Sequence, residues 1–380
     1  MKKIAILGAT GSIGRQALDI IEREPDRFCV TAMTAHSSSA EVTELAKKFG
    51  VKYIGLTGSA GDAEFESSLP KGTQVGYGIK GLLESCSFGD PDIVLIAVVG
   101  IAGLPPLMEC LDRDINVALA NKESLVCGGH LVREKLKNSK SELFPVDSEL
   151  CAIYQCLNGT DTRGLRRILL TASGGPFIDW SKEQIEQATV EQALRHPNWR
   201  MGKKITVDCA TYMNKGLEII ESRWLFDVDP KKIEVVVHRQ SIIHSMIEYD
   251  DGSVIAQMGP TDMRGPIQYA FGHPERLESV VGHLDFPKIG TLTFEAPNLE
   301  KFPCLKHAID AITAGGPMPL IMNAANEAAV ELFLEKRIAF GDIEKSVARA
   351  MDKFSSLPGG SLIEIFTTDR QVKEYVYNHF

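Results

Sequence analysis

Residues 3–14, Lys-Ile-Ala-Ile-Leu-Gly-Ala-Thr-Gly-Ser-Ile-Gly, join an apolar run to a glycine-rich turn and the start of a helix. Residues 3–7 predict a buried strand, and Ile13, Ala17 and Ile20 mark one face of the helix that follows. Glycines in such a turn let the backbone approach a pyrophosphate, and free N–H groups at the helix N-terminus favour an anion. The spacing Gly-x-x-Gly-x-x-Gly therefore predicts a dinucleotide site, with a tight turn that binds nothing as the alternative.

Strand and helix patterns continue to alternate through the first 150 residues. Further strands are predicted at 28–34, 93–99 and 116–120, and a helix at 41–49. Strands that alternate with helices imply a parallel, doubly wound sheet. The fold class is therefore α/β, with a Rossmann-like N-terminal domain.

The rest of the chain changes character twice. Residues 146–290 mix strands at 233–238 and 254–258 with a helix at 210–224, and the polar, poorly periodic segment 181–201 suggests a lid. Later helices are predicted at 307–313, 322–335 and 343–354, with Gly-Gly-Pro and Pro-Gly-Gly runs between them. We therefore predict three domains: a nucleotide-binding domain at 1–146, a catalytic, metal-binding and dimerisation domain at 147–290 with a lid loop at about 181–203, and a C-terminal helical domain at 291–380.

Composition restricts the function classes. The 380 residues carry a net charge of −9, which argues against nucleic acid as the main partner. The eight cysteines contain no Cys-x-x-Cys pair, and the longest apolar run is too short to span a bilayer. The N-terminus also does not resemble a signal peptide. We expect a cytoplasmic protein with reduced thiols and no membrane partner.

The end of the second strand bears on the choice of dinucleotide. Residues 34–39, Thr-Ala-His-Ser-Ser-Ser, contain no acid to bind a ribose 2′-hydroxyl. Their hydroxyls and His36 suit a 2′-phosphate, so NADPH is favoured. No Arg or Lys is present in this segment. Asn121-Lys122-Glu123 follows a later strand, at the sheet edge where such folds bind ligands. A helix cap is the alternative for Asn121, but it leaves Lys122 unexplained.

Two acids follow the apolar residues 145–146. If this segment is extended, Asp147 and Glu149 point to the same side. With a third carboxylate from Glu218 they would form an all-oxygen site for Mg²⁺ or Mn²⁺. Judged from the spacing of Asp147 and Glu149 alone, two carboxylates that point separately into solvent are the more frequent outcome.

The predicted helix at 210–224 carries a polar group beside an apolar stripe. Met213, Leu217, Ile220 and Trp224 repeat at helical spacing and predict a buried seam. Asn214, Lys215 and Glu218 lie together on a neighbouring face, because residues three and four apart are adjacent on a helix. An amide, an ammonium and a carboxylate suit an anionic, oxygen-rich ligand, whereas a solvated face is the commoner reading.

Two loops supply further candidates. Residues 171–177, Thr-Ala-Ser-Gly-Gly-Pro-Phe, offer N–H and hydroxyl donors to a phosphate, or form a simple turn. His196 heads His-Pro-Asn-Trp, where Trp199 suits a lid that excludes water.

His238 and His244 are predicted to share one face of a strand, and we interpret that strand as part of a sheet or subunit interface rather than as a metal site. For Asn323 and Asn326 packing is the preferred interpretation.

The order of these motifs resembles the 1-deoxy-D-xylulose 5-phosphate reductoisomerase family. The matching segments are 8–14, 119–126, 145–149, 171–177, 196–199, 207–218 and 238–246. The resemblance runs from Lys2 to about Glu331. It implies a homodimeric enzyme that uses NADPH and Mn²⁺, Mg²⁺ or Co²⁺ to rearrange and reduce 1-deoxy-D-xylulose 5-phosphate to 2-C-methyl-D-erythritol 4-phosphate, in non-mevalonate isoprenoid biosynthesis.

The resemblance also implies residue roles by position. Metal ligands would be Asp147, Glu149 and Glu218, and catalytic groups Lys122, Glu149, Glu218 and His196. Substrate contacts would add Ser148, Ser173, Cys209, Asn214 and Lys215 to those four catalytic groups. NADPH would contact Thr10, Gly11, Ser12, Ile13, Ser38, Asn121, Glu123 and Gly202, with Trp199 and Met201 on the closing lid.

Three positions depart from the family pattern. His36-Ser37-Ser38 stands where the family usually has Gly-(Arg/Lys)-Asn, Leu150 replaces a histidine, and Cys209 replaces a phosphate-binding serine. Losing one hydrogen bond to a charged group costs roughly 1.5–3 kcal/mol, so we expect looser substrate binding with intact chemistry. A diverged NADP-dependent paralogue acting on another phosphosugar or keto acid, and a catalytically dead binding protein, are the alternatives. Retention of Asp147, Glu149 and Glu218 argues against the catalytically dead binding protein.

Overall fold

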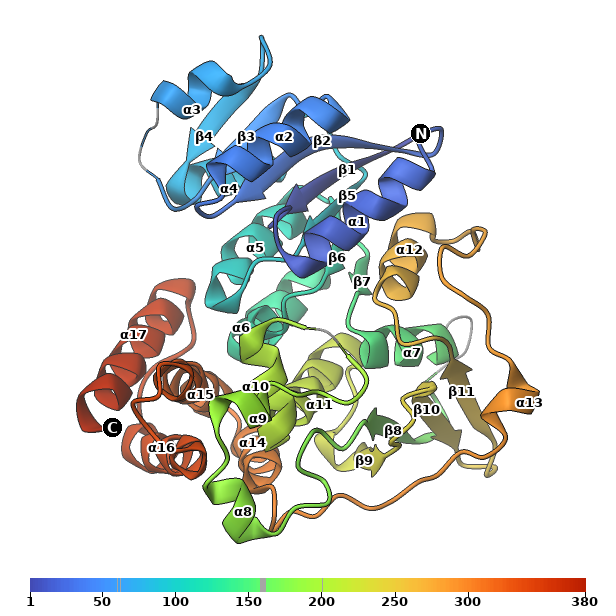
Figure 1. The fold of residues 1–380 in the computed structure, drawn as a ribbon, viewed down its shortest axis with the longest axis vertical. Coiled ribbons are helices and arrows are strands. Elements are labelled where there is room, and N and C mark those ends of the chain that lie inside the picture. The colour runs from blue at the N-terminus through green and yellow to red at the C-terminus, as the bar shows by residue number, and fades with distance from the viewer. Residues whose placement is uncertain (60, 62, 158–161, 200) are drawn as a thin grey trace. The chain divides into compact units, whose positions relative to one another are not determined.

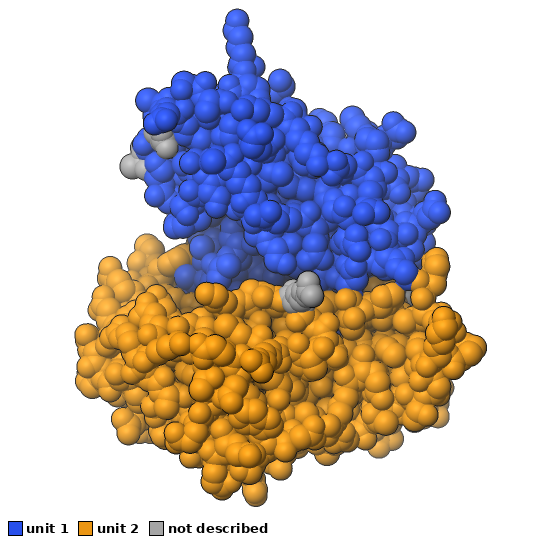
Figure 2. Space-filling model, in the orientation of Figure 1, with its two compact units in different colours: residues 1–124, 132–151, 262–282 blue, residues 125–131, 152–261, 283–380 orange. Residues whose placement is uncertain are grey.

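The computed structural model describes residues 1–59, 61, 63–157, 162–199 and 201–380. Its contacts divide the chain into two compact units, coloured separately in Figure 2. Unit 1 contains residues 1–124, 132–151 and 262–282, and unit 2 contains residues 125–131, 152–261 and 283–380. Unit 2 thus includes both the predicted central domain's sheet and the C-terminal helices. The predicted division into three domains stays a prediction.

Unit 1 is built on a parallel sheet of seven strands. The strands are β1 (Lys2–Leu7), β2 (Phe28–Ala35), β3 (Tyr53–Leu56), β4 (Gln74–Tyr77), β5 (Ile93–Ile96), β6 (Asn116–Leu119) and β7 (Leu143–Pro145), in the spatial order β4-β3-β2-β1-β5-β6-β7 (Figure 1). The chain runs outward from β1 in one direction and then from β5 in the other. Right-handed crossovers therefore place the connecting helices of the two halves on opposite faces, which confirms the doubly wound fold.

The helices of unit 1 connect these strands. They are α1 (Ser12–Arg23), α2 (Ser39–Phe49), α3 (Ala63–Ser68), α4 (Gly78–Ser85), η1 (Gly100–Gly103) and α5 (Leu104–Asp112). Two further helices, α6 (Lys122–Leu136) and α7 (Ser148–Leu157), begin in unit 1 and contribute residues to both units. The predicted strands at 28–34, 93–99 and 116–120 and the helix at 41–49 are all present, although β5 ends three residues earlier than expected.

A late segment of the chain returns to unit 1. Helix α12 (Arg264–Gly272) contacts α1, β6 and β7. Arg264 pairs with Asp19 of α1 at 2.8 Å, and the Lys2 ammonium donates to the Phe271 carbonyl at 3.1 Å. No local pattern in 262–282 signals this attachment, because it depends on contacts between residues about 245 positions apart.

Unit 2 combines a mixed sheet with helices. The sheet order is β11-β10-β8-β9, from β8 (Leu165–Ala172), β9 (Ile233–Val237), β10 (Ile243–Tyr249) and β11 (Val254–Met258). A turn separates β9 from β10, so the prediction that His238 and His244 share one strand is wrong. Each imidazole instead contacts a backbone carbonyl: His238 that of Thr293 at 2.9 Å, and His244 that of Pro260 at 3.3 Å.

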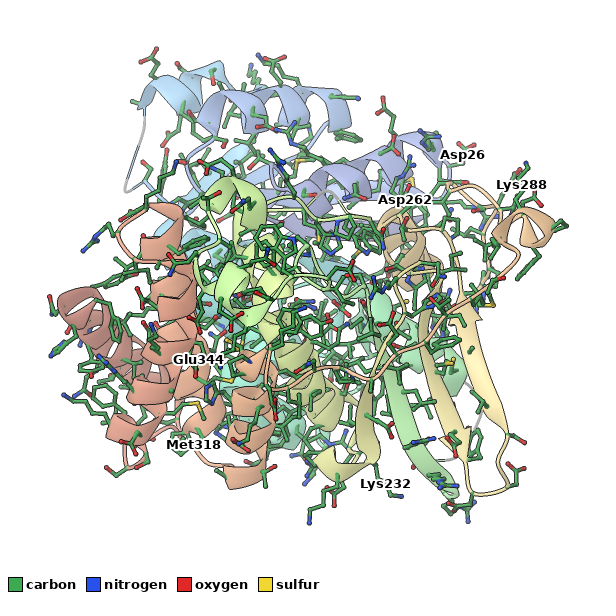
Figure 3. All side chains as sticks on the ribbon, turned by 60° about the horizontal axis from the view of Figure 1, so that its bottom comes forward. Asp26, Lys232, Asp262, Lys288, Met318 and Glu344 are labelled. Carbon is green, nitrogen blue, oxygen red and sulfur yellow. The ribbon has the colours of Figure 1, made fainter. Side chains whose placement is uncertain are left out.

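The remaining elements of unit 2 are helical. Before β9 come α8 (Lys182–Glu186), α9 (Val190–Ala193), α10 (Lys203–Thr211), α11 (Met213–Phe226) and η2 (Pro230–Lys232); after β11 come α13 (Phe286–Ile289), α14 (Pro303–Ala314), α15 (Met318–Leu334), α16 (Phe340–Phe354) and α17 (Leu362–His379). Figure 3 labels Met318, where α15 begins, and Glu344 on α16. The His307 ring contacts Glu344 at 2.7 Å and lowers the pKa of that carboxyl.

The sequence patterns did not predict helix α17. Among the described residues, no helix is both long and apolar enough to cross a membrane.

A charged cluster fixes α17 against α15. The Lys373 ammonium lies 2.6 Å from Glu327 and 3.0 Å from Asp369, and both carboxylates are largely buried. Burial alone would lower the pKa of Lys373, but the two carboxylates raise it. Burial raises the pKa of Asp369. The cluster is therefore stable only while the ammonium stands between the two acids.

Lys373→Met is expected to lower the free energy of unfolding by about 3 kcal/mol at neutral pH, because it leaves two buried carboxylates without their cation. Without Lys373, the folded-state pKa of Asp369 lies further above its unfolded value. A carboxyl whose pKa is raised by folding contributes to the free energy of unfolding in full below its unfolded pKa. That contribution is lost as pH rises through the folded pKa. The deficit should thus shrink as urea unfolding is repeated from about pH 7 down to about pH 4. A deficit independent of pH would contradict this account.

Candidate functional site

The glycine turn lies where strand order reverses between β1 and β5. Gly8 adopts a φ of +94°, and an added Cβ there would lie 2.6 Å from the Ala97 carbonyl oxygen. A Cβ on Gly14 would overlap the Gly8 oxygen and lie 2.6 Å from Ala9 Cα. Only glycine fits these two places, so α1 begins tight against β1. Its N-cap, Gly11, has no side chain to occupy the first-turn N–H groups.

Four of the predicted cofactor residues lie at this N-terminus. Thr10 and Ile13 are partly exposed, and Gly11 and Ser12 are exposed. Free N–H groups, exposed backbone and a topological switch point together fit a pyrophosphate. Ser38 is also exposed, and is the N-cap of α2. Gly202 lies in unit 2 as the exposed N-cap of α10.

Asn121 has the capping role that the sequence left as an alternative. It is the N-cap of α6 and accepts from Ser124 N at 2.9 Å, while its amide donates to the carbonyls of Val98 and Gly100 and to Glu123. These bonds hold Asn121 and Glu123 buried at the carboxyl ends of β5 and β6. Asn121 therefore also positions the side chain of the next residue, Lys122. Its contact with NADPH stays a prediction.

Lys122 and Asp147 form a close ion pair in unit 1. Both side chains are mostly buried, with exposed fractions of 9% and 14%. The second oxygen of Asp147 accepts from Glu149 N at 3.1 Å and Leu150 N at 3.2 Å, and Ser148 donates to Glu149. The sequence prediction of an extended strand through Glu149 is wrong: β7 ends at Pro145, and Glu149 lies in the first turn of α7. Asp147 caps the N-terminus of that helix, so the two acids still lie close together.

In unit 2, the predicted helix at 210–224 is two helices. Tyr212 has a φ of 64° and ends α10 as its C-cap, so α11 starts only at Met213. The Tyr212 ring stacks on Phe302 with centroids 4.2 Å apart, which holds this kink. Met213, Leu217 and Ile220 are buried as predicted, whereas Trp224 is partly exposed.

Asn214, Lys215 and Glu218 lie together as the helical spacing predicted. Asn214 donates to one oxygen of Glu218 at 2.6 Å, and the Lys215 ammonium contacts the other. Their surroundings differ from the solvated-face alternative, since Glu218 is fully buried and Lys215 is 5% exposed. A buried carboxylate is costly without a cation, and a buried ammonium without an anion. The trio is thus a preformed charged site rather than a surface face.

Ser173 and His196 form a second pair in unit 2. His196 Nδ1 accepts from the backbone N–H groups of Asn198 at 3.2 Å and Trp199 at 3.0 Å. Because Nδ1 is an acceptor, the ring proton resides on Nε2, which donates to the Ser173 hydroxyl at 3.1 Å. The pair presents one imidazole N–H and one hydroxyl, both suited to a phosphate or a polar substrate.

The predicted lid segment contains more regular structure than expected. Ser181 and Thr189 begin α8 and α9 with complete capping boxes. Beyond them, the Asn198 amide donates to the Arg239 carbonyl at 2.7 Å, and the Trp199 ring lies 6.2 Å from His244. Residue 200 of this segment is outside the described residues. Met201 is partly exposed, and mobility of the lid stays a prediction.

The other two departures from the family pattern lie in different surroundings. Leu150 is completely buried in α7, so its side chain packs in the interior rather than offering a polar group. Cys209 is partly exposed on α10, one turn before the kink. A thiol is a weaker hydrogen-bond donor than the serine hydroxyl that the family has at this predicted phosphate contact.

The acid that anchors α10 was not predicted from the sequence. Asp208 is buried beside Cys209, and its two oxygens contact Lys204 at 2.9 Å and the Asn326 amide at 2.8 Å. The Lys204–Asp208 spacing of four was a detectable helical signal. The contribution of Asn326, interpreted as packing, depends on a contact across 118 residues and had no local signal.

The structure thus brings the predicted residues together in three groups. In unit 1, Lys122, Asp147, Ser148 and Glu149 meet at the carboxyl end of the parallel sheet. In unit 2, Asn214, Lys215 and Glu218 form one group, and Ser173 and His196 another. The carboxylates of the first two groups offer oxygen atoms alone, which fits Mg²⁺ or Mn²⁺ rather than zinc.

Comparison with known proteins identifies related chains over the whole sequence. Family models described as 1-deoxy-D-xylulose 5-phosphate reductoisomerase match residues 4–129, and models of its C-terminal domains match residues 143–226 and 258–375. Proteins of that name from Clostridium kluyveri and Chloroherpeton thalassium are each 46% identical; both alignments cover 100% of this chain, and they cover 100% and 98% of the relatives.

Solved structures give the same result. The Zymomonas mobilis enzyme of that name in complex with NADPH has a TM-score of 0.92 and 40% identity, covering 99% of this chain and 98% of the other. A DOX-P reductoisomerase in complex with NADPH, fosmidomycin and magnesium has a TM-score of 0.94 and 39% identity, covering 100% and 98%.

Proposed function

This chain belongs to the 1-deoxy-D-xylulose 5-phosphate reductoisomerase family, and from that premise we propose which of its residues carry the reaction. The chain is an NADPH- and divalent-metal-dependent enzyme that converts 1-deoxy-D-xylulose 5-phosphate. Its reaction rearranges that substrate and reduces the product to 2-C-methyl-D-erythritol 4-phosphate. The observation that carries the residue assignment is the buried carboxylate Glu218, held with Lys215 and Asn214 on a kinked helix.

We assign the cation to Asp147, Glu149 and Glu218. When bound, the metal ion supplies Lewis-acid stabilisation of negative charge on the substrate oxygens. Asp147 is oriented by two backbone N–H groups, and Glu149 by Ser148, so these acids are held in place by the chain itself.

Lys122 is assigned to the boundary between substrate and cofactor. Its ammonium pairs with Asp147, and the adjacent cap Asn121 fixes its helix to the strand ends. There it can bind a substrate oxygen and offset developing negative charge. NADPH, when bound, supplies the hydride, and the glycine turn together with the N-terminus of α1 would hold its pyrophosphate.

The phosphate group of the substrate is assigned to Ser173, Cys209, Asn214 and Lys215, with His196 alongside. His196 offers an Nε2 proton because its other nitrogen is occupied by two backbone donors. Trp199, carried on the same loop, would exclude water when this loop closes over the substrate. Ser148 would contact the substrate beside the metal ligands.

His196→Gln is expected to raise KM for the substrate about tenfold or more, as loss of a hydrogen bond to a charged group does. The Kd for NADPH should stay unchanged, because His196 is assigned to the substrate and to no cofactor contact. Steady-state kinetics and nicotinamide fluorescence measure the two constants. An unchanged KM would remove His196 from the substrate site.

The function itself is tested by following nicotinamide absorbance with 1-deoxy-D-xylulose 5-phosphate, first after chelation and then with Mn²⁺ or Mg²⁺ restored. Oxidation of NADPH should require both the substrate and the metal. Measurable NADPH binding without turnover at saturating metal and substrate would contradict the reductoisomerase assignment. Turnover with a different phosphosugar or keto acid would instead indicate the diverged paralogue.

We also propose that the enzyme is a cytoplasmic homodimer. Strand β11 is an edge of its sheet and exposes Val254 and Ile255, and Phe286 is 59% exposed. Exposed apolar side chains on an edge strand are typical of a subunit interface. All eight cysteines are thiols outside any disulfide bond, as expected of a reducing compartment. Sedimentation of the purified chain tests the dimer, and a monomer at micromolar concentration would contradict it.

A further inference from the structure

The adenosine end of the cofactor site has an unusual charge balance. NADPH differs from NADH by a phosphate on the adenosine ribose, and a doubly wound fold recognises it at the end of β2. In this chain the segment 36–38, His-Ser-Ser, supplies no Arg or Lys. An Arg or Lys that binds this phosphate would therefore have to come from another element. This inference rests on the proposed function, because it takes NADPH as the cofactor.

The glycine turn and the end of β2 are pinned side by side. Gly8 N and Ala9 N both donate to the Thr34 carbonyl, at 3.2 and 2.8 Å, and Gly8 N also approaches the Thr34 hydroxyl at 2.9 Å. Thr34 is only two residues before His36. The pyrophosphate cradle and the segment that follows β2 consequently form one continuous surface.

Arg15 extends across that surface. It lies in the first turn of α1, where its Nε donates to the Thr10 carbonyl at 3.0 Å. Its terminal nitrogen pairs with Glu41 in the first turn of α2, at 2.6 Å. The side chain therefore reaches from the glycine turn to the helix that begins directly after residues 36–38. It is 61% exposed, so its guanidinium is accessible to a ligand.

His36 follows β2 directly and is held by the two residues that follow β3. Its Nδ1 lies 3.1 Å from the Thr57 hydroxyl, and its carbonyl accepts from Gly58 N at 2.8 Å. A Cβ on Gly58 would lie 3.1 Å from the imidazole ring, so the ring packs directly over that glycine. These contacts fix the ring at the carboxyl end of β2, where it is exposed.

We propose that Arg15 is the residue that selects NADPH over NADH, with His36 as a second donor. Glu41 holds the guanidinium in place and yields it to the 2′-phosphate, which carries more charge and more acceptor oxygens than a carboxylate. A planar guanidinium bonds phosphate in a bidentate manner, and such charged bonds are the stronger class. Ser37 and Ser38 add hydroxyl donors from the same segment.

Arg15→Ala tests the proposal by binding alone. The Kd for NADPH and for NADH is measured from nicotinamide fluorescence, with no substrate or metal present. We expect the NADPH Kd to rise about ten- to a hundredfold, as the loss of a charged hydrogen bond implies. The NADH Kd should not change. Arg23→Ala is the matched control, because Arg23 lies on the same helix and pairs with Asp19.

Two further variants sharpen the result. Glu41→Gln should tighten NADPH and leave NADH unaffected, since it removes the competing anion. Arg15→Lys should retain part of the preference, because it keeps the charge but not the fork. If Arg15→Ala binds NADPH normally and has the same ratio of NADH Kd to NADPH Kd as the wild type, this inference alone is overturned. Absence of NADPH binding in the wild type would overturn the proposed function as well.

Discussion

Glu218→Gln is expected to lower metal-dependent turnover about a hundred- to a thousandfold, as the loss of one preorganised charged group does. The carboxylate is fully buried and accepts from both Asn214 and Lys215. A neutral amide of the same shape removes one charge from the proposed cation site. It also deprives the buried Lys215 ammonium of its nearby anion. The measurement is kcat at saturating substrate and NADPH across a Mn²⁺ titration.

Two comparisons separate catalysis from folding. Glu335→Gln removes an exposed carboxylate that pairs with Arg337, and it should leave kcat and Tm unchanged. NADPH affinity of Glu218→Gln should match the wild type, because Glu218 is assigned to the cation and to no cofactor contact. Wild-type kcat and an unaltered Mn²⁺ requirement in Glu218→Gln would exclude this residue from the metal site.

Gly14→Ala is expected to abolish measurable NADPH binding and to lower the free energy of unfolding by about 1–3 kcal/mol or more, as overpacking does. The new methyl group would overlap the Gly8 carbonyl oxygen and press on Ala9. Both contacts are backbone atoms, which cannot turn aside as a flexible side chain can. The start of α1 must then move away from β1, and the anion cradle opens.

Gly265→Ala is the matched control for this change. It lies in α12 of the same unit, and none of the described residues comes within 4 Å of its added Cβ. It should therefore preserve both stability and cofactor affinity. Thermal unfolding and nicotinamide fluorescence report on the two quantities. Normal NADPH affinity in Gly14→Ala would show that the close approach of α1 to β1 is not required.

The parallel sheet was predictable because its signals are local. Each strand is a short apolar run, and each helix repeats its apolar residues at 3.6 positions. The strands β1, β2 and β6 and the helix α2 were accordingly placed within one or two residues. Strand order and the return of α12 to unit 1 were not predictable in this way, because they depend on contacts between distant residues.

The candidate site shows the same division. The grouping of Asn214, Lys215 and Glu218 followed from helical spacing, and the structure confirms it. The geometry at Asp147 did not follow, since a helix N-cap and a strand end have similar short patterns. The kink at Tyr212 was equally hidden, because its positive φ is held by stacking on Phe302 from a distant segment.

By itself, the sequence determined the fold class, the family and the chemical types at the site: a glycine turn for an anion, oxygen-only carboxylates for a hard cation, and a lysine beside them. These follow from residue type and from spacing within one element. Tertiary structure alone decided that Glu218 is buried, that His196 carries its proton on Nε2, and that Arg15 extends toward the start of α2. Burial and hydrogen-bond direction depend on which distant atoms exclude water and face each group, and no local pattern contains that information.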